Sequence, residues 1–303
     1  MKRDLISFAL WTRDDLSGVF DLAKRLKSGP GDAYTPLKGK SAALIFERES
    51  LRTRVSFEVG ILRLGGHSIV LQQETIGMAT RESVHDIAQV LSQYNNLIIA
   101  RTIRHQTCVQ LAESATVPVI NAMTDLLHPC QILADAFTLL ELNRLSPSAK
   151  IVFVGEGNNI VNSWLEFARI IPLQLVISCP PGYEPHPQLL EEAEQAGVST
   201  IRIIPDPAAA VKDADVIYTD VWPPAREPGG EALRSATFKP YQVNKAVLKL
   251  ARPDCIVMHR LPANRGEEIT NEVIDGKQSV VLRQAGNRLH VQNAAMAFLL
   301  GAG

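Results

Sequence analysis

The alternation of short apolar runs with helical segments limits the fold of this 303-residue sequence more than any other feature. Apolar runs such as 41–46 and 151–154 are each followed by a helical segment, and the polar segment 143–150 interrupts the pattern. Repeated β-α units favour parallel sheets covered by helices. We therefore predict an α/β protein with two domains, each a doubly wound αβα sandwich around a parallel sheet, with the active site in the cleft between them.

The interruption divides the sequence into two predicted domains of ordinary size, residues 1–145 and 146–303. We expect the last helix, near 286–300, to pack back on the first domain. No internal repeat or low-complexity segment disturbs this division.

Composition narrows the class of protein. A formal charge of −1 and an aromatic content of 6% argue against a general nucleic-acid surface. No run approaches the roughly 20 apolar residues that a membrane span requires, and the start of the sequence does not have the character of a signal peptide. The four cysteines are Cys108, Cys130, Cys179 and Cys255, and their wide spacing gives no zinc motif. We therefore expect them to be reduced thiols in a cytoplasmic protein.

The segment Ser50-Leu51-Arg52-Thr53-Arg54 follows the apolar run 42–45 and precedes an apolar-rich helical segment. At such a strand-to-helix turn the first backbone N–H groups of the helix lack intrahelical partners and carry the positive end of its dipole. Two hydroxyls and two guanidiniums join them, which predicts a site for an oxyanion, with phosphate as the first candidate. The alternative is a serine N-cap followed by surface arginines.

Other polar residues also follow strand-like runs, and ligands of parallel sheets bind at the carboxyl ends of strands. These are Arg101, His128–Gln131, Asn158–Asn159, Asp220 and His259–Pro262. The repetition predicts one shared site.

The chemistry of these clusters suits acyl transfer. His128 and Gln131 project from a helix start and can donate to a carbonyl oxygen that gains charge. Arg101 can hold phosphate or the same carbonyl, a carboxylate at Asp220 can hold an amine, and Pro262 favours an exposed carbonyl at Leu261. The alternatives are a histidine N-cap, an exposed strand-end arginine and a turn cap.

Several motifs in one order carry a resemblance that spans essentially the whole sequence. They are Ser50–Arg54, His128-Pro129-Cys130-Gln131, Gly155–Asn159, Asp220-Val221-Trp222, His259–Ala263 and Asn287-Arg288-Leu289-His290. Together they resemble the aspartate/ornithine carbamoyltransferase family. Tyr241–Asn244 and Gly266-Glu267-Glu268 place the sequence closest to the ornithine branch.

The resemblance implies that the first domain binds carbamoyl phosphate and the second binds the amino acid. It implies transfer of the carbamoyl group to an amine, foremost ornithine, giving citrulline and phosphate in arginine metabolism. It also implies a homotrimer or a multiple of trimers, with no metal or organic cofactor and no nucleic-acid or membrane partner.

The resemblance assigns roles residue by residue. The residues implied to bind carbamoyl phosphate are Ser50, Leu51, Arg52, Thr53, Arg54, Arg81, Arg101, His128, Gln131, Leu261 and Arg288. Arg81 in this set is expected to reach a neighbouring subunit's site. The amine is implied to meet Asn159, Asp220 and Arg260. The catalytic residues implied are Arg52, Arg101, His128, Gln131 and Asp220, with Thr53, Arg101 and His128 meeting the oxyanion.

The sequence departs from the ornithine branch mainly on the amine side. The usual Ser-Met-Gly is replaced within 223–230, and Arg260 stands where the branch has cysteine. A guanidinium there would repel cationic ornithine unless Asp220 or another acid pairs with it. An expected glutamine is Thr75, and an expected glutamate is Gly286.

Three functions therefore stay open. The first is ornithine carbamoyl transfer with a variant loop. The second is transfer to an acylated or carboxylated amine, with Arg260 or Arg226 binding the extra carboxylate. The third is a binding paralogue without turnover. A dehydrogenase is disfavoured, because Gly155-x-Gly157 is followed by Ile160 where a dinucleotide turn needs a small residue.

Overall fold

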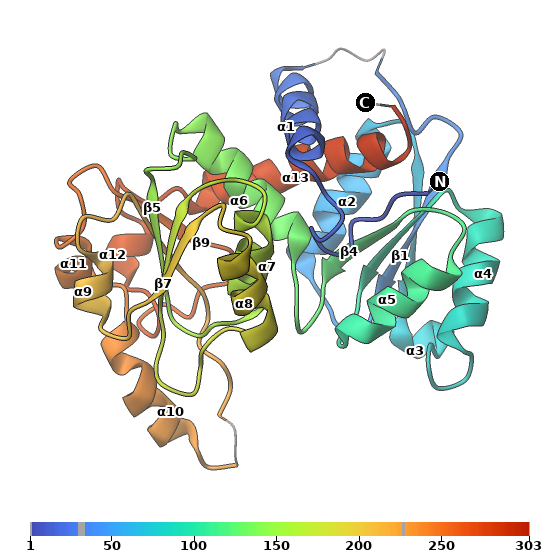
Figure 1. The fold of residues 1–303 in the computed structure, drawn as a ribbon. Coiled ribbons are helices and arrows are strands. Elements are labelled where there is room, and N and C mark those ends of the chain that lie inside the picture. The colour runs from blue at the N-terminus through green and yellow to red at the C-terminus, as the bar shows by residue number, and fades with distance from the viewer. Residues whose placement is uncertain (1, 30–33, 226–227, 303) are drawn as a thin grey trace. The chain divides into compact units, whose positions relative to one another are not determined.

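The computed structural model describes residues 2–29, 34–225 and 228–302. The chain divides into two compact units, of which unit 1 comprises Met1–Phe137 with Gly286–Gly303 and unit 2 comprises Thr138–Ala285. Each unit contains one parallel sheet (Figure 1). Among the helices of the described ranges, none has both the length and the apolar character needed to cross a membrane.

Unit 1 is built on a four-stranded parallel sheet with the order β2-β1-β3-β4. Its strands are β1 (Ser41–Phe46), β2 (His67–Gln72), β3 (Leu97–Arg101) and β4 (Val119–Met123). Its helices are α1 (Arg13–Ser28), α2 (Leu51–Arg63), α3 (Gln73–Ile76), α4 (Val84–Tyr94) and α5 (His105–Ser114). The division between the units falls within α6 (Pro129–Glu141) and α13 (Val281–Leu299).

Local sequence signals explain these elements. Thr12 caps α1 through a capping box with Asp15, and the five residues after Ser41 in β1 are all buried. Right-handed crossovers place α2 on one face of the sheet and α4 with α5 on the other, because the strand order reverses between β1 and β3. The buried cluster that joins β1, β3 and β4 to α4 and α5 agrees with this arrangement.

Unit 2 is built on a five-stranded parallel sheet with the order β7-β6-β5-β8-β9. Its strands are β5 (Lys150–Val154), β6 (Gln174–Ser178), β7 (Thr200–Ile203), β8 (Val216–Thr219) and β9 (Ile256–His259). Its helices are α7 (Asn159–Ala168), α8 (Pro187–Gln195), α9 (Pro207–Val211), α10 (Glu231–Phe238), α11 (Lys245–Leu248) and α12 (Asn271–Ile274), with the 3₁₀ helix η1 (Lys239–Tyr241).

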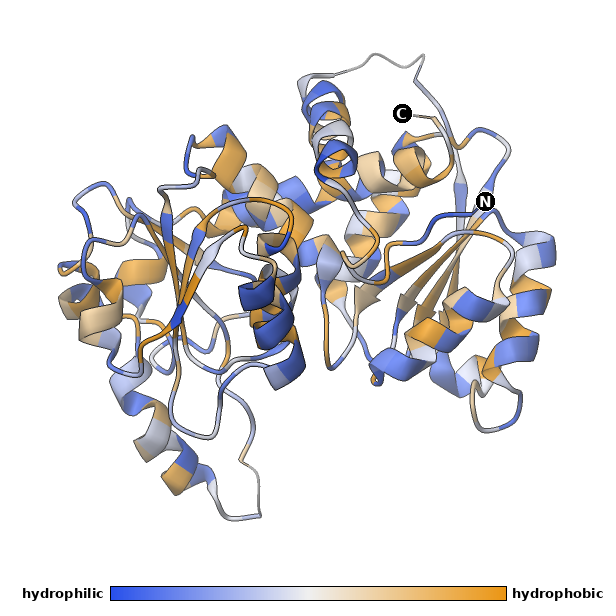
Figure 2. Ribbon diagram, in the orientation of Figure 1, coloured by the Kyte–Doolittle hydropathy of each residue, from blue (hydrophilic) through white to orange (hydrophobic). Residues whose placement is uncertain are grey.

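The strand order of unit 2 reverses between β5 and β8. The same crossover rule puts α7 and α8 on one face, where they lie side by side (Figure 1). A buried cluster that includes residues of β5, β8, β9, α9 and α12 forms the core of the other face. Figure 2 shows the inner strands of each sheet as predominantly hydrophobic, as expected for strands covered on both sides, whereas the edge strands β2 and β7 are partly exposed.

The predicted α/β class with parallel sheets is confirmed. The apolar runs 41–46 and 151–154 form β1 and β5, and β5 begins one residue earlier, at Lys150. The last helix begins at Val281 rather than near 286.

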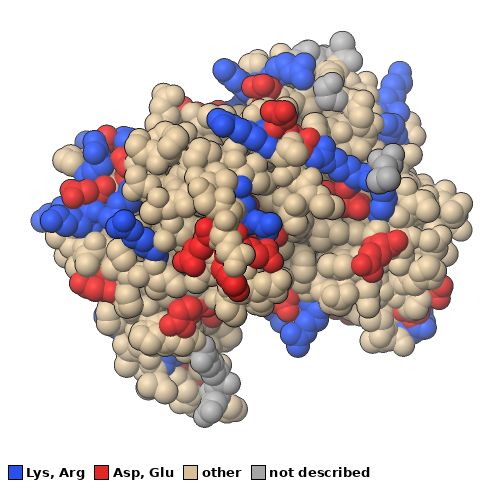
Figure 3. Space-filling model, in the orientation of Figure 1, with Lys and Arg blue, Asp and Glu red and all other residues tan. Residues whose placement is uncertain are grey.

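Charges of both signs are interspersed on the face of the molecule seen in Figure 3.

Candidate functional site

In unit 1 the polar segment after β1 and the end of β3 lie at the point where the strand order reverses. Phe46 at the end of β1 is the register partner of Arg101 at the end of β3. Ser50–Arg54 follows β1 and opens α2. In open parallel sheets such a switch point is where ligands bind, so the fold brings the predicted oxyanion segment and Arg101 to the expected place.

The start of α2 has the geometry of an anion site. Ser50 is the N-cap, and its Oγ accepts from the backbone N–H of Thr53 at 3.3 Å. Thr53 is fully buried, while Arg52 is half-buried. A cavity of about 500 Å³ opens beside this turn. Its lining is Phe46, Glu47, Arg48, Glu49, Ser50, Leu51, Arg54, Val55, Val70, Gln72 and Glu74.

A buried hydrogen-bond network joins three distant parts of the chain in unit 1. Arg288, only 4% exposed, donates through Nη2 to Thr53 Oγ1 at 3.0 Å and through Nη1 to Gln131 Oε1 at 3.2 Å. Gln131 Nε2 in turn donates to Asp135 Oδ1 at 2.8 Å. A guanidinium is thereby fixed next to the helix start that carries the anion-binding amides.

His128 and Arg101 complete the predicted donor set of unit 1. His128 is buried directly before α6, and Arg101 is half-buried with Nη1 3.0 Å from the sulfur of Met123. Burial raises the pKa of the neighbouring Cys130 to about 12, although the positive charge of Arg288 opposes this rise. The Cys130 thiol therefore stays neutral at ordinary pH and adds no negative charge beside these donors.

Three predicted residues of unit 1 are peripheral to this network. Leu51 is 74% exposed. Arg54 is exposed and pairs with Glu58 at 3.1 Å, one turn further along α2. Arg81 is exposed and donates through Nη2 to the carbonyl of Ile76 at 3.2 Å, so it folds onto its own turn.

In unit 2 the predicted amine residues also lie at a switch point. Val154 at the end of β5 is the register partner of Thr219 at the end of β8, and Thr219 pairs on its other side with His259 of β9. Asp220 therefore sits between the turn that opens α7 and the segment after β9. Asn158, the N-cap of α7, donates through Nδ2 to Asp220 Oδ2 at 2.9 Å.

Arg260 is bound to the carboxylate of Asp220. Its Nε lies 2.6 Å from Asp220 Oδ2, and its side chain is 15% exposed against 1% for that of Asp220. Asn159 is buried as the first residue of α7. Arg226, the other residue suggested for an extra carboxylate, lies outside the described residues together with Glu227.

A buried scaffold fixes the backbone of Leu261. The Leu261 N–H donates to His259 Nδ1 at 2.9 Å, so the proton of this imidazole is on Nε2, which lies 3.0 Å from Glu268 Oε1. His259 and Glu268 are fully buried, and Leu261 adopts a left-handed φ of 56°. Within the described ranges no hydrogen bond reaches the Leu261 carbonyl, which leaves that oxygen able to accept one from a ligand.

Sequence reasoning placed Asn158 in the cluster Asn158–Asn159 without a role of its own, and it did not single out Asp135 or Glu268 as functional residues. Asn158 carried a signal as the N-cap of a helix after a strand, and Asp135 as a polar residue one helical turn after Gln131. Glu268 lay within a recognised motif, but its bond to His259 depends on tertiary structure.

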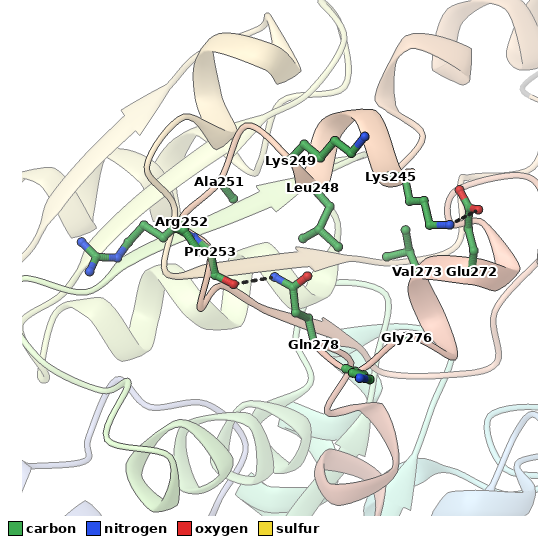
Figure 4. A pocket seen from close by; sticks show the side chains of 11 residues that line it. Lys245, Leu248, Lys249, Ala251, Arg252, Pro253, Glu272, Val273, Gly276 and Gln278 are labelled. Atoms are coloured by element: carbon green, nitrogen blue, oxygen red, sulfur yellow. Dashed lines mark hydrogen bonds and ion pairs between the residues drawn. The ribbon is translucent and has the colours of Figure 1, made fainter.

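A second cavity in unit 2, also of about 500 Å³, lies at the amino end of β9 and so at the opposite edge of the sheet (Figure 4). Leu248, Ala251 and Val273 give it an apolar wall, and Lys245 pairs with Glu272 at 3.0 Å. None of the predicted site residues lines it.

Known proteins resemble this chain over nearly its whole length. A family model described as the carbamoyl-P binding domain of aspartate/ornithine carbamoyltransferase matches residues 3–141, and the model of its Asp/Orn binding domain matches 148–299. An ornithine carbamoyltransferase of Chlorobaculum tepidum is 46% identical over 99% of this chain and 90% of its own length. The one from Syntrophus aciditrophicus is also 46% identical, over 99% and 100%. The solved ornithine carbamoyltransferase from Pyrococcus furiosus superposes with a TM-score of 0.94 at 41% identity, covering 100% of this chain and 98% of its own.

Proposed function

The chain belongs to the aspartate/ornithine carbamoyltransferase family, and we propose that it transfers the carbamoyl group of carbamoyl phosphate to the side-chain amine of ornithine. The products are citrulline and phosphate, which places the reaction in arginine metabolism. The observation that carries the proposal is the buried bonding of Arg288 to Thr53 and Gln131. This bonding fixes the Arg288 guanidinium beside the start of α2, and a helix start is a favourable place for a phosphate.

Unit 1 supplies the carbamoyl phosphate side of this proposal. Ser50, Arg52, Thr53 and the first amides of α2 bind the phosphate, because they combine positive charge with the N–H groups of a helix start. His128 and Gln131 donate toward the carbamoyl group, and Arg101 lies at the end of the neighbouring strand.

Unit 2 supplies the amine side. Asp220 and Asn159 hold ornithine, and the Leu261 carbonyl accepts from the carbamoyl NH₂. The support for Leu261 is its fixed backbone, which the His259–Glu268 pair anchors from behind.

The reaction proceeds by direct attack of the neutral amine on the carbonyl carbon. The new N–C bond forms, the oxyanion is stabilised by Thr53, Arg101 and His128, and the C–O bond to phosphate then breaks. The phosphate leaves with the electron pair and takes up the proton that the nitrogen loses. Its charge is already met by Arg52 and the start of α2, so catalysis consists of positioning and electrostatic stabilisation.

The contact between Arg260 and Asp220 favours ornithine over an amine that bears an extra carboxylate. A guanidinium that already binds a buried carboxylate has less attraction left for a second one. We therefore place the carboxylated amine second, as an outcome that the assay below can reveal.

We further propose that the chain acts as a homotrimer. Leu51, Val55 and Leu62 are exposed on one side of α2, with Ile69 exposed on the edge strand β2. The helical residues share a face because their spacings of four and seven are close to whole turns. An exposed apolar strip of this kind suits a subunit contact, and light scattering should give three times the 33.2 kDa chain mass.

A cytoplasmic location is also proposed. Each of the four cysteines is free and buried, which suits a reducing compartment. Fractionation of the source cells would test it, and recovery with the exported proteins would contradict it.

The function is tested by assaying carbamoyl phosphate with ornithine, N-acetylornithine, aspartate and an aliphatic diamine in parallel. We expect equal amounts of citrulline and phosphate with ornithine, and much lower rates with the other amines. Phosphate release without any amine corrects for spontaneous breakdown. Preference for an acylated or dicarboxylic amine would support the second function, and tight carbamoyl phosphate binding without turnover would support the third.

A further inference from the structure

In the structure the buried carboxylate of Asp220 already has a cationic partner from its own chain. Arg260 Nε and Asn158 Nδ2 both approach Asp220 Oδ2, at 2.6 Å and 2.9 Å. The other oxygen, Oδ1, is buried and accepts no hydrogen bond from any residue within the described ranges. One oxygen is thus occupied by internal donors, while the other keeps its capacity for a ligand.

This arrangement matters because ornithine reaches the enzyme as a cation. Its side-chain amine resembles that of lysine, with an ordinary pKa of about 10.4, so a proton must be lost to solvent before attack. An isolated Asp220 carboxylate would bind the ammonium tightly and also retain its proton. A second cation on the same carboxylate opposes both effects, and burial limits screening by salt.

We propose that Arg260 is a positioning residue that neutralises Asp220, so that the site binds the ornithine ammonium weakly and favours the unprotonated amine that attacks. This inference rests on the proposed function and adds a residue that sets substrate affinity and pH dependence. Arg260 remains charged throughout, because guanidinium does not deprotonate in proteins. It therefore acts on the substrate through Asp220 and not as a base.

Other charged groups on the surrounding segments must be separated from this effect. They are Glu156 after β5, Glu184 beside Gly157, the His259–Glu268 pair and the Arg234–Glu267 pair. The two pairs are compensated internally, and the two remaining glutamates favour a protonated amine with or without Arg260. A comparison that changes only Arg260 therefore isolates its contribution.

The test compares wild type with the neutral variants Arg260→Cys and Arg260→Gln and the charged variant Arg260→Lys. The glutamine variant keeps a donor for Asp220 without the charge. Arg252→Cys is the matched control. Arg252 precedes the amino end of β9, whereas Arg260 follows its carboxyl end, and Arg252 is bound to Asp215 at 3.2 Å. Figure 4 shows its side chain beside the second cavity, at the edge of the sheet opposite to Asp220. For each protein, kcat and the KM for ornithine are measured from pH 6 to 10.

Both neutral variants should lower the KM for ornithine at pH 7 about tenfold, because the ammonium is no longer repelled. The acid limb of their kcat profile should move up by about one pH unit, because the bound amine holds its proton more strongly. Arg260→Lys should restore both values, and Arg252→Cys should match wild type.

An ornithine analogue without the terminal amine gives an independent readout. Inhibition by 2-aminopentanoate should be equal in wild type and the neutral variants, since it keeps the α-ammonium of ornithine but carries no side-chain ammonium for Arg260 to repel. If wild type turns over normally but neither neutral variant changes the KM for ornithine or the acid limb of the kcat profile, this inference alone is overturned. Wild type that forms no citrulline would overturn the proposed function and this inference with it.

Discussion

The two switch points of the molecule differ in how their charges are compensated. In unit 1 the buried cation Arg288 donates hydrogen bonds to neutral oxygens of Thr53 and Gln131. In unit 2 the buried anion Asp220 is bound by a cation, Arg260. The first switch point therefore presents a guanidinium beside a helix start that suits an anion, whereas in the second the buried carboxylate already has a cationic partner.

This difference supports the proposed division of roles, in which the switch point of unit 1 binds an anion and that of unit 2 binds an amine. In unit 1, Thr53, Gln131 and Arg288 match the family pattern and are joined by hydrogen bonds. In unit 2, Arg260 departs from the pattern and is bound to the carboxylate of Asp220.

The largest effect should come from removing the cation of unit 1. Arg288→Met should lower kcat/KM for carbamoyl phosphate about a thousandfold, because a fixed charged donor is lost from a buried site. Calorimetry of carbamoyl phosphate binding and steady-state kinetics would measure this. Arg283→Met is the control, since Arg283 is exposed on the same helix. Unchanged binding in Arg288→Met would show that the anion lies elsewhere.

The second-largest effect should come from Gly157→Ala, which we expect to weaken ornithine binding and to leave carbamoyl phosphate binding nearly unchanged. A Cβ at Gly157 would lie 2.2 Å from the backbone nitrogen of Pro185, so Gly157→Ala must displace the turn that carries Asn158. We expect a loss of stability of about 1–3 kcal/mol and a raised KM for ornithine. Carbamoyl phosphate affinity should change less than twofold. An equal loss on both sides would break the comparison between the sites.

A smaller effect is expected at Asp135, which accepts a hydrogen bond from the side-chain amide of Gln131. Asp135→Ala removes a buried acceptor, and an unsatisfied buried donor costs about 1–3 kcal/mol. We expect kcat to fall about tenfold as the Gln131 amide loses its orientation, with the KM for ornithine unchanged. Asp135→Asn retains an acceptor oxygen and should recover most of the activity. Equal damage from both substitutions would indicate that the charge of Asp135 matters instead.

The smallest effect should be at Gly286, where the family pattern has a glutamate. A Cβ at this helical position meets no atom within 4 Å, so Gly286→Ala should raise the free energy of unfolding by about 0.5–1 kcal/mol. Chemical denaturation measures this, and the kinetics should stay as in wild type. A fall in carbamoyl phosphate affinity would show that this position needs glycine for function.

The sequence was sufficient for the parts of the molecule that depend on local signals. The apolar run 41–46 and the alternation of elements predicted the parallel sheets, and Ser50 is the N-cap of α2 that was considered as the alternative to an oxyanion site. What it could not predict were bonds between distant residues. Arg288 and Thr53 are 235 positions apart, and no local pattern shows that the Arg288 guanidinium reaches that hydroxyl.

Arg260 illustrates the same limit. The sequence showed a guanidinium where the family pattern has cysteine, and it left open whether Asp220 would pair with it. The answer depends on β8 and β9 being neighbours in the sheet, which brings residues 40 positions apart within hydrogen-bond distance. Asp135 lay on the same helical face as Gln131, but side-chain direction decided that it binds the amide.

The most direct test of the account is a crystal structure with a bisubstrate analogue that joins a phosphonate to the side-chain nitrogen of ornithine. We predict that the phosphonate lies against the first amides of α2, Arg52 and Thr53, with Arg288 beside it. The substituted nitrogen should lie at Asp220 Oδ1, while Arg260 remains on Oδ2. A phosphonate away from α2, or a nitrogen with no contact to Asp220, would contradict the account.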